Sequence, residues 1–174
     1  MTNETSRNPA FPDNIDLYAA GPELDAILAE RVLDARVGRY EERWSGYWNV
    51  IATAPDGAQL YIEVSPHFAL GPVPLWNPST NLSDAQVLVR HLYMHSDYWS
   101  MTEEGTDETG YSVTLWAKRP LDPAVTGVKP GDGRQWVEIS SVTGSGPTPA
   151  IAICRAVYKA ASDMRPRQSS IVSK

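Results

Sequence analysis

The most constraining feature of the sequence is an unbroken helical pattern near its C-terminal end. Thr148 followed by Pro149 is a strong helix start, because the threonine hydroxyl can cap the first turn and proline suits the first helical position. After it, apolar residues recur at helical spacing in one stripe, formed by Ala150, Ile153, Cys154, Val157, Tyr158 and Ala161. The stripe predicts a helix over about 149–163 that is buried along one side.

Two further helices are predicted, over about 22–35 and 84–95. Gly21 is a suitable cap for the first, and Pro22 takes its first helical position. A capping-box pattern that begins at Ser83 opens the second. Each segment also carries apolar residues three and four apart, so each should place one face against a core.

Strand patterns fill the remaining segments. Alternating polar and apolar residues predict strands over 47–54, 58–65, 98–102, 111–118 and 135–142. Pro55-Asp56-Gly57 is a good turn for a hairpin between the first two. No strand–helix–strand rhythm runs through the chain. The expected fold class is therefore α+β, a mostly antiparallel sheet packed with three main helices.

Length and composition indicate one soluble domain. The chain has 174 residues, and we expect a domain over 15–164 with mobile tails at 1–14 and 165–174. Its single cysteine excludes an internal disulfide and a cysteine-based zinc finger. The absence of a membrane-length apolar stretch and of a signal-peptide pattern favours the cytoplasm. A net charge of −6 argues against a partner that is a nucleic acid polymer or a membrane.

The segment that leads into the last helix is the main candidate for ligand binding. Glycines allow backbone amides to approach a ligand, and a helix N-terminus attracts anions, so Ser145, Gly146 and Thr148 could seat a phosphate. Arg155 and Lys159 lie one helical turn apart and could neutralise its charge. The segment has neither the Walker pattern nor the dinucleotide fingerprint. The alternative is an ordinary loop and cap beside a solvated helix flank.

Aromatic residues on the strands offer a second hint of ligand binding. Period-two geometry places Tyr61, Trp116 and Trp136 on the less apolar faces of their strands. A second helix layer or a subunit interface could cover them, or they could stack against a nucleobase. For four other tryptophans the sequence leaves core and pocket positions equally open: Trp44, Trp48, Trp76 and Trp99.

Catalytic signatures are weak. His91 and His95 have the one-turn spacing of a paired metal site, but the sequence fixes no third ligand, and a surface or helix-end position is the alternative. Cys154 belongs to the apolar stripe, where a cysteine acts as a small hydrophobic residue. We therefore expect no catalytic residue, no bound metal and no cofactor.

Three sequence blocks, at 21–30, 78–82 and 148–156, resemble the phage ABA sandwich family. The resemblance implies helix–sheet–helix layers. Some proteins similar to this family are anti-Thoeris sponges, which bind cyclic ADP-ribose-type signals or cyclic oligonucleotides as symmetric oligomers without cleaving them. The third block carries over Thr148 at the helix start and Arg155 within the helix. Lys159 is added from helical spacing alone.

The resemblance implies a non-enzymatic phage anti-defence protein. It would sequester a cyclic nucleotide immune signal in the host bacterial cytoplasm, and its partners would be that small molecule and further copies of itself. Two alternatives stay open at this point. One is a metal-assisted or nucleotide hydrolase, and the other is a structural or protein-binding phage accessory protein.

Overall fold

A computed structural model of the chain describes most of the expected domain. The described residues are 14–42, 46–66, 73–95, 99–107, 110–120 and 136–164. Asn14 is the one residue of the two expected tails that the structure describes. Its side chain accepts a hydrogen bond from the amide of Asp16 at 3.0 Å. The other residues of 1–14 and all of 165–174 lie outside the described residues.

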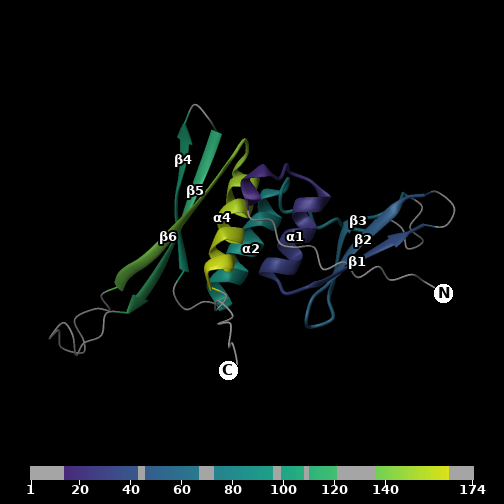
Figure 1. Cartoon of the computed structure of the whole chain (residues 1–174), viewed down its shortest axis with the longest axis horizontal. Coiled ribbons are helices and arrows are strands. Elements are labelled where there is room, and N and C mark those ends of the chain that lie inside the picture. The colour runs from purple at the N-terminus through teal and green to yellow at the C-terminus, as the bar shows by residue number, and fades with distance from the viewer. Residues whose placement is uncertain are drawn as a thin grey trace, which may run out of the picture.

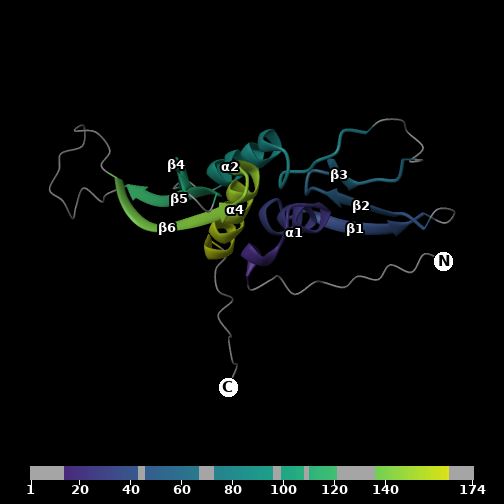
Figure 2. The ribbon, with the colours of Figure 1, turned by 90° about the horizontal axis from the view of Figure 1, so that it is seen from above.

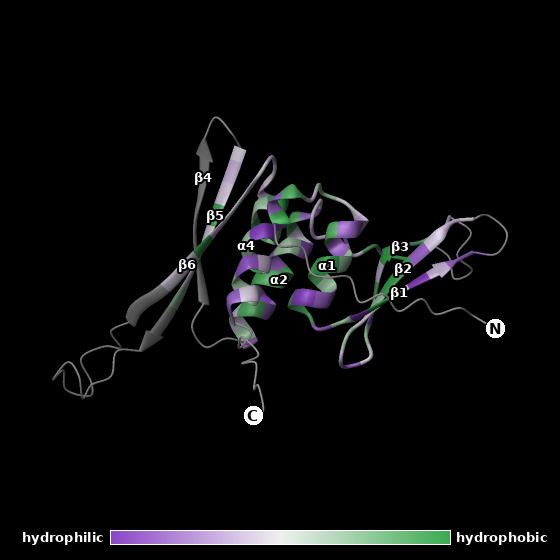
Figure 3. Ribbon diagram, viewed as in Figure 1, coloured by the Kyte–Doolittle hydropathy of each residue, from purple (hydrophilic) through white to green (hydrophobic). Residues whose placement is uncertain are grey.

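Three α-helices form the centre of the described fold, and each confirms a predicted helix (Figure 1). Figure 3 shows hydrophobic and hydrophilic residues alternating around them, as the sequence patterns require. The helices are α1 (Pro22–Val32), α2 (Leu82–His95) and α4 (Pro149–Met164), and a short 3-10 helix, η1 (Ile15–Leu17), precedes them.

The first two helices differ from the prediction at their ends. Gly21 enters α1 with a φ of 148°, a conformation that favours glycine, and Asp34 ends the segment in the left-handed region with a φ of 51°. Helix α1 therefore stops short of residue 35. The cap of α2 is Asn81, whose side chain accepts from the amides of Ser83 at 2.9 Å and Asp84 at 3.4 Å. The capping box predicted at Ser83 is wrong, because Ser83 is already inside the helix.

The described strands form two separate three-stranded antiparallel sheets, in the orders β1-β2-β3 and β4-β5-β6. The first contains β1 (Arg36–Glu41), β2 (Trp48–Thr53) and β3 (Gln59–Glu63), and the second contains β4 (Trp99–Asp107), β5 (Gly110–Pro120) and β6 (Trp136–Gly146). Strand β1 was not predicted, and β6 runs four residues beyond its predicted end at 142.

The helices lie between the two sheets (Figures 1 and 2). Helix α4 packs against β5 and β6, and α1 packs against all three strands of the other sheet. The α+β class with antiparallel pairing is confirmed. The layer order implied by the resemblance is not found, since the described chain stacks sheet, helices and sheet instead of helix, sheet and helix.

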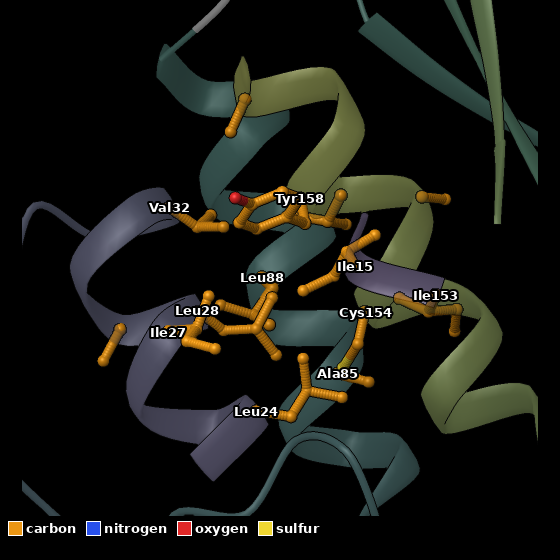
Figure 4. Close-up of a cluster of buried hydrophobic side chains, with 14 of the residues drawn as sticks. Ile15, Leu24, Ile27, Leu28, Val32, Ala85, Leu88, Ile153, Cys154 and Tyr158 are labelled. Carbon is orange, nitrogen blue, oxygen red and sulfur yellow. The ribbon is translucent and has the colours of Figure 1, made fainter. Parts of the chain in front are cut away.

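The core forms where the three helices meet (Figure 4). Leu24 and Leu28 from α1, Leu88 from α2 and Ile153 from α4 are each fully buried. Burying one such side chain contributes roughly 1.5–3 kcal/mol. Cys154 lies in the same cluster, as predicted, and burial raises the pKa of its thiol far above the ordinary value.

The same core continues onto both sheets. Val113 and Leu115 of β5 face α4, and Ala52 and Ile62 face α1 from the first sheet. Trp76 is also buried, which answers the core-or-pocket question for that residue. In the described part of the chain, no helix combines the length and the apolarity that a membrane crossing requires.

Candidate functional site

The predicted glycine loop is the end of a strand. Within β6, Gly144 pairs with Val113 and Gly146 pairs with Tyr111 of β5. The alternation of the strand leaves Ser145 exposed and buries both glycines against α4. The loop interpretation of this segment is therefore wrong up to residue 146, because these residues form a strand that is hydrogen-bonded to β5.

Close packing of strand on helix explains the two glycines. A β-carbon at Gly144 would collide with the backbone of Ala152 and Ala156 in α4. A β-carbon at Gly146 would collide with the side chain of Ile151. Residues without side chains are needed here so that β6 can reach α4.

Thr148 occupies the predicted capping position. Its hydroxyl accepts a hydrogen bond from the amide of Ile151 at 3.4 Å, and its carbonyl accepts from the amide of Ala152 at 3.1 Å. The first turn of α4 is therefore capped from within the chain, as the Thr-Pro pattern predicts.

The two cations predicted to hold phosphate lie side by side but bind protein oxygens. Arg155 donates to the carbonyls of Ser145 at 2.6 Å and of Tyr18 at 2.9 Å. Lys159 donates to the Asp16 carboxylate at 2.8 Å and to the carbonyl of Thr143 at 2.9 Å. Together these contacts join η1 and β6 to α4. We name the six residues the α4 clasp: Asp16, Tyr18, Thr143, Ser145, Arg155 and Lys159.

The clasp leaves little of Arg155 accessible. Its side chain is 13% exposed, and the Asp16 carboxylate stands 4.0 Å from its Nε, beyond hydrogen-bond distance. That Nε is buried without a hydrogen-bond partner. The structure therefore brings Ser145, Arg155 and Lys159 together, yet it commits both cations to contacts within the chain.

The predicted aromatic platform is dispersed. Trp116 is half-buried on the face of β5 opposite Leu115, as period-two geometry predicts, and it pairs with Ser141. The backbone of Trp136 pairs with Pro120, four residues further along β5 and so about 13 Å away. Tyr61 belongs to the other sheet. Trp44 and the side chains of Trp99 and Trp136 lie outside the described residues.

The histidine pair is present but incomplete. The rings of His91 and His95 lie with their centroids 4.2 Å apart. Burial, followed by the neighbouring His95, lowers the pKa of His91, so a neutral ring is favoured there. In the described stretches, no cluster of three or more His, Cys, Asp or Glu residues could hold a metal ion.

A hollow on the first sheet is a concave site that described residues line. Its volume is about 590 Å³. We name it the β1–β3 hollow, and the described residues that line it are Arg39, Gly46, Tyr47, Trp48, Val50 and Glu63. Tyr47 and Trp48 are each 51% exposed, so their rings are accessible. Trp48, for which the sequence left core and pocket positions open, therefore lines a pocket.

Strand register gives the hollow its charge pattern. Arg39 of β1 pairs with Val50 of β2, which in turn pairs with Glu63 of β3. The three residues thus form one row across the sheet. Arg39 also influences α1, where its charge opposes the rise in the pKa of Glu30 that burial causes. Among the described residues, the half-buried side chain of Glu63 has neither a hydrogen-bond partner nor an ion-pair partner.

The hollow was not predicted from the sequence, because the strand β1 that forms one side of it was not predicted. The segment Arg36–Glu41 contains few apolar residues, and most of its side chains are exposed. The available signal was the adjacent pair Tyr47-Trp48 at the start of the strand predicted over 47–54, because two neighbouring aromatic residues on a strand point to opposite faces and cannot both enter one core.

No family model, no curated protein and no solved structure matches the chain.

Proposed function

We propose that the protein binds and sequesters a small nucleotide-type ligand without cleaving it, and that the ligand occupies the β1–β3 hollow. The observation that carries this proposal is the combination of accessible Tyr47 and Trp48 rings with the Arg39 guanidinium around one concave volume. Its volume of about 590 Å³ falls within the range typical of small-molecule sites.

The chemistry of the lining suits a ligand that is flat at one end and anionic at the other. Stacking of a base on an aromatic side chain contributes about 1–3 kcal/mol. A guanidinium can hold a phosphate through two parallel charge-assisted hydrogen bonds. None of the six described lining residues is Ser, Thr, Cys or His. The phenol of Tyr47 and the carboxylate of Glu63 are the groups among them that could act as a nucleophile, so the test for cleavage below is needed.

The biological part of the proposal comes from the sequence resemblance. If the likeness of residues 21–30, 78–82 and 148–156 to the phage ABA sandwich family reflects shared function, the ligand is a cyclic ADP-ribose-type signal or a cyclic oligonucleotide. The cellular role is then that of a phage anti-defence protein. We place the ligand at the hollow because Arg155 and Lys159 are already bound within the α4 clasp.

Binding measurements on paired variants test the location. Calorimetry with cyclic ADP-ribose and a panel of cyclic di- and trinucleotides identifies a ligand for the wild-type protein. Tyr47→Ala should then weaken binding by about tenfold or more through lost stacking. Tyr40→Ala is the matched control, because Tyr40 is 55% exposed on the same sheet but does not line the hollow.

A second pair of variants separates the two cationic places. Arg39→Ala should weaken binding strongly, whereas Arg155→Ala should leave the affinity unchanged. Loss of binding only in Arg155→Ala would place the ligand at the α4 clasp and overturn the hollow. Absence of binding by every nucleotide in the panel would contradict the proposed function and favour a protein-binding role.

Recovery of the ligand distinguishes a binder from an enzyme. The complex is incubated, denatured and analysed by mass spectrometry. A sequestering protein releases its ligand unchanged. Hydrolysed product, formed in a time-dependent way, would show an enzyme instead.

A further inference from the structure

The β1–β3 hollow carries charges of opposite sign at its two sides. Neighbouring strands lie about 4.8 Å apart, so the pairing of Arg39 with Val50 and of Val50 with Glu63 separates the Cα atoms of the two charged residues by about 10 Å. Trp48 is two residues from Val50 on β2 and lines the same hollow. An aromatic surface therefore adjoins a floor that has a cation on one side and a carboxylate on the other.

Glu63 stands at the end of this row opposite Arg39. Its side chain is half-buried, and within the described residues no donor contacts it. An ionised carboxylate only accepts hydrogen bonds, and its two oxygens match a pair of parallel N–H donors. A ligand that fills the hollow must supply donors at this end, because covering the carboxylate without them costs free energy.

We infer, resting on the proposed function, that Glu63 determines specificity and selects a base of the guanine type. Of the two ligand classes proposed above, the ligand is then a guanine-containing cyclic oligonucleotide and not the adenine-containing cyclic ADP-ribose type. Guanine presents an imino N–H next to an amino group, which are the two adjacent donors that a carboxylate accepts. Adenine presents its amino group next to an acceptor nitrogen, and that nitrogen would face a carboxylate oxygen unfavourably. Glu63 thus contacts the base edge, Trp48 the base face and Arg39 the phosphate.

Three nucleoside monophosphates test this assignment on the full-length protein. GMP offers two adjacent donors, IMP offers the imino donor alone, and AMP offers an amino donor beside an acceptor. Calorimetric titration should give affinities in the order GMP, IMP, AMP, with about tenfold or more between the first and the last. A site built around hydrogen bonds discriminates strongly against analogues that lack them.

Variants assign the discrimination to Glu63. Glu63→Gln should reduce the ratio of GMP to AMP affinity to within about threefold, and a thermal melt checks that the variant is folded. Glu41→Gln is the matched control, since it removes one acidic charge from the same sheet without lining the hollow, and it should keep the ratio. Arg39→Ala should weaken all three nucleotides alike, because each carries the same phosphate.

The outcomes separate this inference from the proposed function. Equal affinity for GMP and AMP in the wild-type protein, or an unchanged ratio in Glu63→Gln, overturns the role of Glu63 while nucleotide binding in the hollow stands. Failure of the wild-type protein to bind these monophosphates and every cyclic nucleotide overturns both.

Discussion

A buried carboxyl group on α1 should make the protein less stable as the pH rises through the mildly acidic range. Asp25 is 1% exposed, and it accepts a hydrogen bond from the amide of Ser79 at 2.8 Å. Burial raises its pKa from 3.8 to about 6. The hydrogen bonds from Ser79 act in the opposite direction, and the nearby charge of Asp84 adds to the rise.

The sign follows from the protons bound in each state. The unfolded chain releases the Asp25 proton near its ordinary pKa of 3.8, whereas the folded protein keeps it until about 6. Between those values the folded state binds more protons, so the free energy of unfolding falls as the pH rises and levels off above the folded pKa. A pKa difference of about two units corresponds to about 3 kcal/mol.

Urea denaturation of the wild-type protein and of Asp25→Asn, from about pH 3.5 to 8, measures this effect. Asparagine keeps an oxygen that can accept from Ser79 but has no proton to release. The difference between the two curves isolates Asp25 from the other titrating groups. We expect the wild-type free energy of unfolding, relative to the variant, to fall by about 3 kcal/mol between about pH 4 and 7. A flat or rising difference would refute a buried Asp25 carboxyl whose pKa is raised.

Three further predictions concern α4 and its neighbours. Gly144→Ala should destabilise the fold by about 1–3 kcal/mol or more in thermal denaturation, because its β-carbon meets helix backbone, whereas exposed Ser145→Ala should stay within about 0.5 kcal/mol. Cys154 should resist thiol reagents in the native protein and react fully in urea, since burial raises its pKa; rapid native labelling would contradict the core position. Asp16→Asn should cost less than about 1 kcal/mol, because its ion pair with Lys159 is partly exposed to solvent; a larger loss would make the clasp a major element of stability.

The helices could be predicted because their signals are local. Pro22 and Pro149 suit a first helical position, and the stripes that follow fix which face is buried. Strand β1 could not be found in this way. It is an edge strand with alternation too weak to recognise, and its place is set by pairing with β2. The hollow depends on that pairing, which brings Arg39 beside Val50.

The glycines of β6 show how one sequence pattern can fit two different structures. A backbone that approaches a phosphate and a backbone that approaches a helix both require the absence of a β-carbon. The distinguishing signal lies in the partner segment. Ala152 and Ala156 are small residues one turn apart on α4, and they form the surface that Gly144 contacts. Paired small residues on both elements indicate packing between elements, whereas glycines alone indicate nothing specific.

The two cationic places differ in what a ligand would have to displace. At the α4 clasp, a phosphate would have to replace two backbone carbonyls on Arg155 and the carboxylate on Lys159, and it would leave those oxygens to find new donors. Each hydrogen bond gained there would be offset by one lost. Arg39 lies exposed at the rim of the hollow, and its influence on Glu30 is electrostatic. An anion there would gain charge-assisted hydrogen bonds without breaking the joint between η1, β6 and α4, and for this reason we propose the hollow, and not the clasp, as the place for binding.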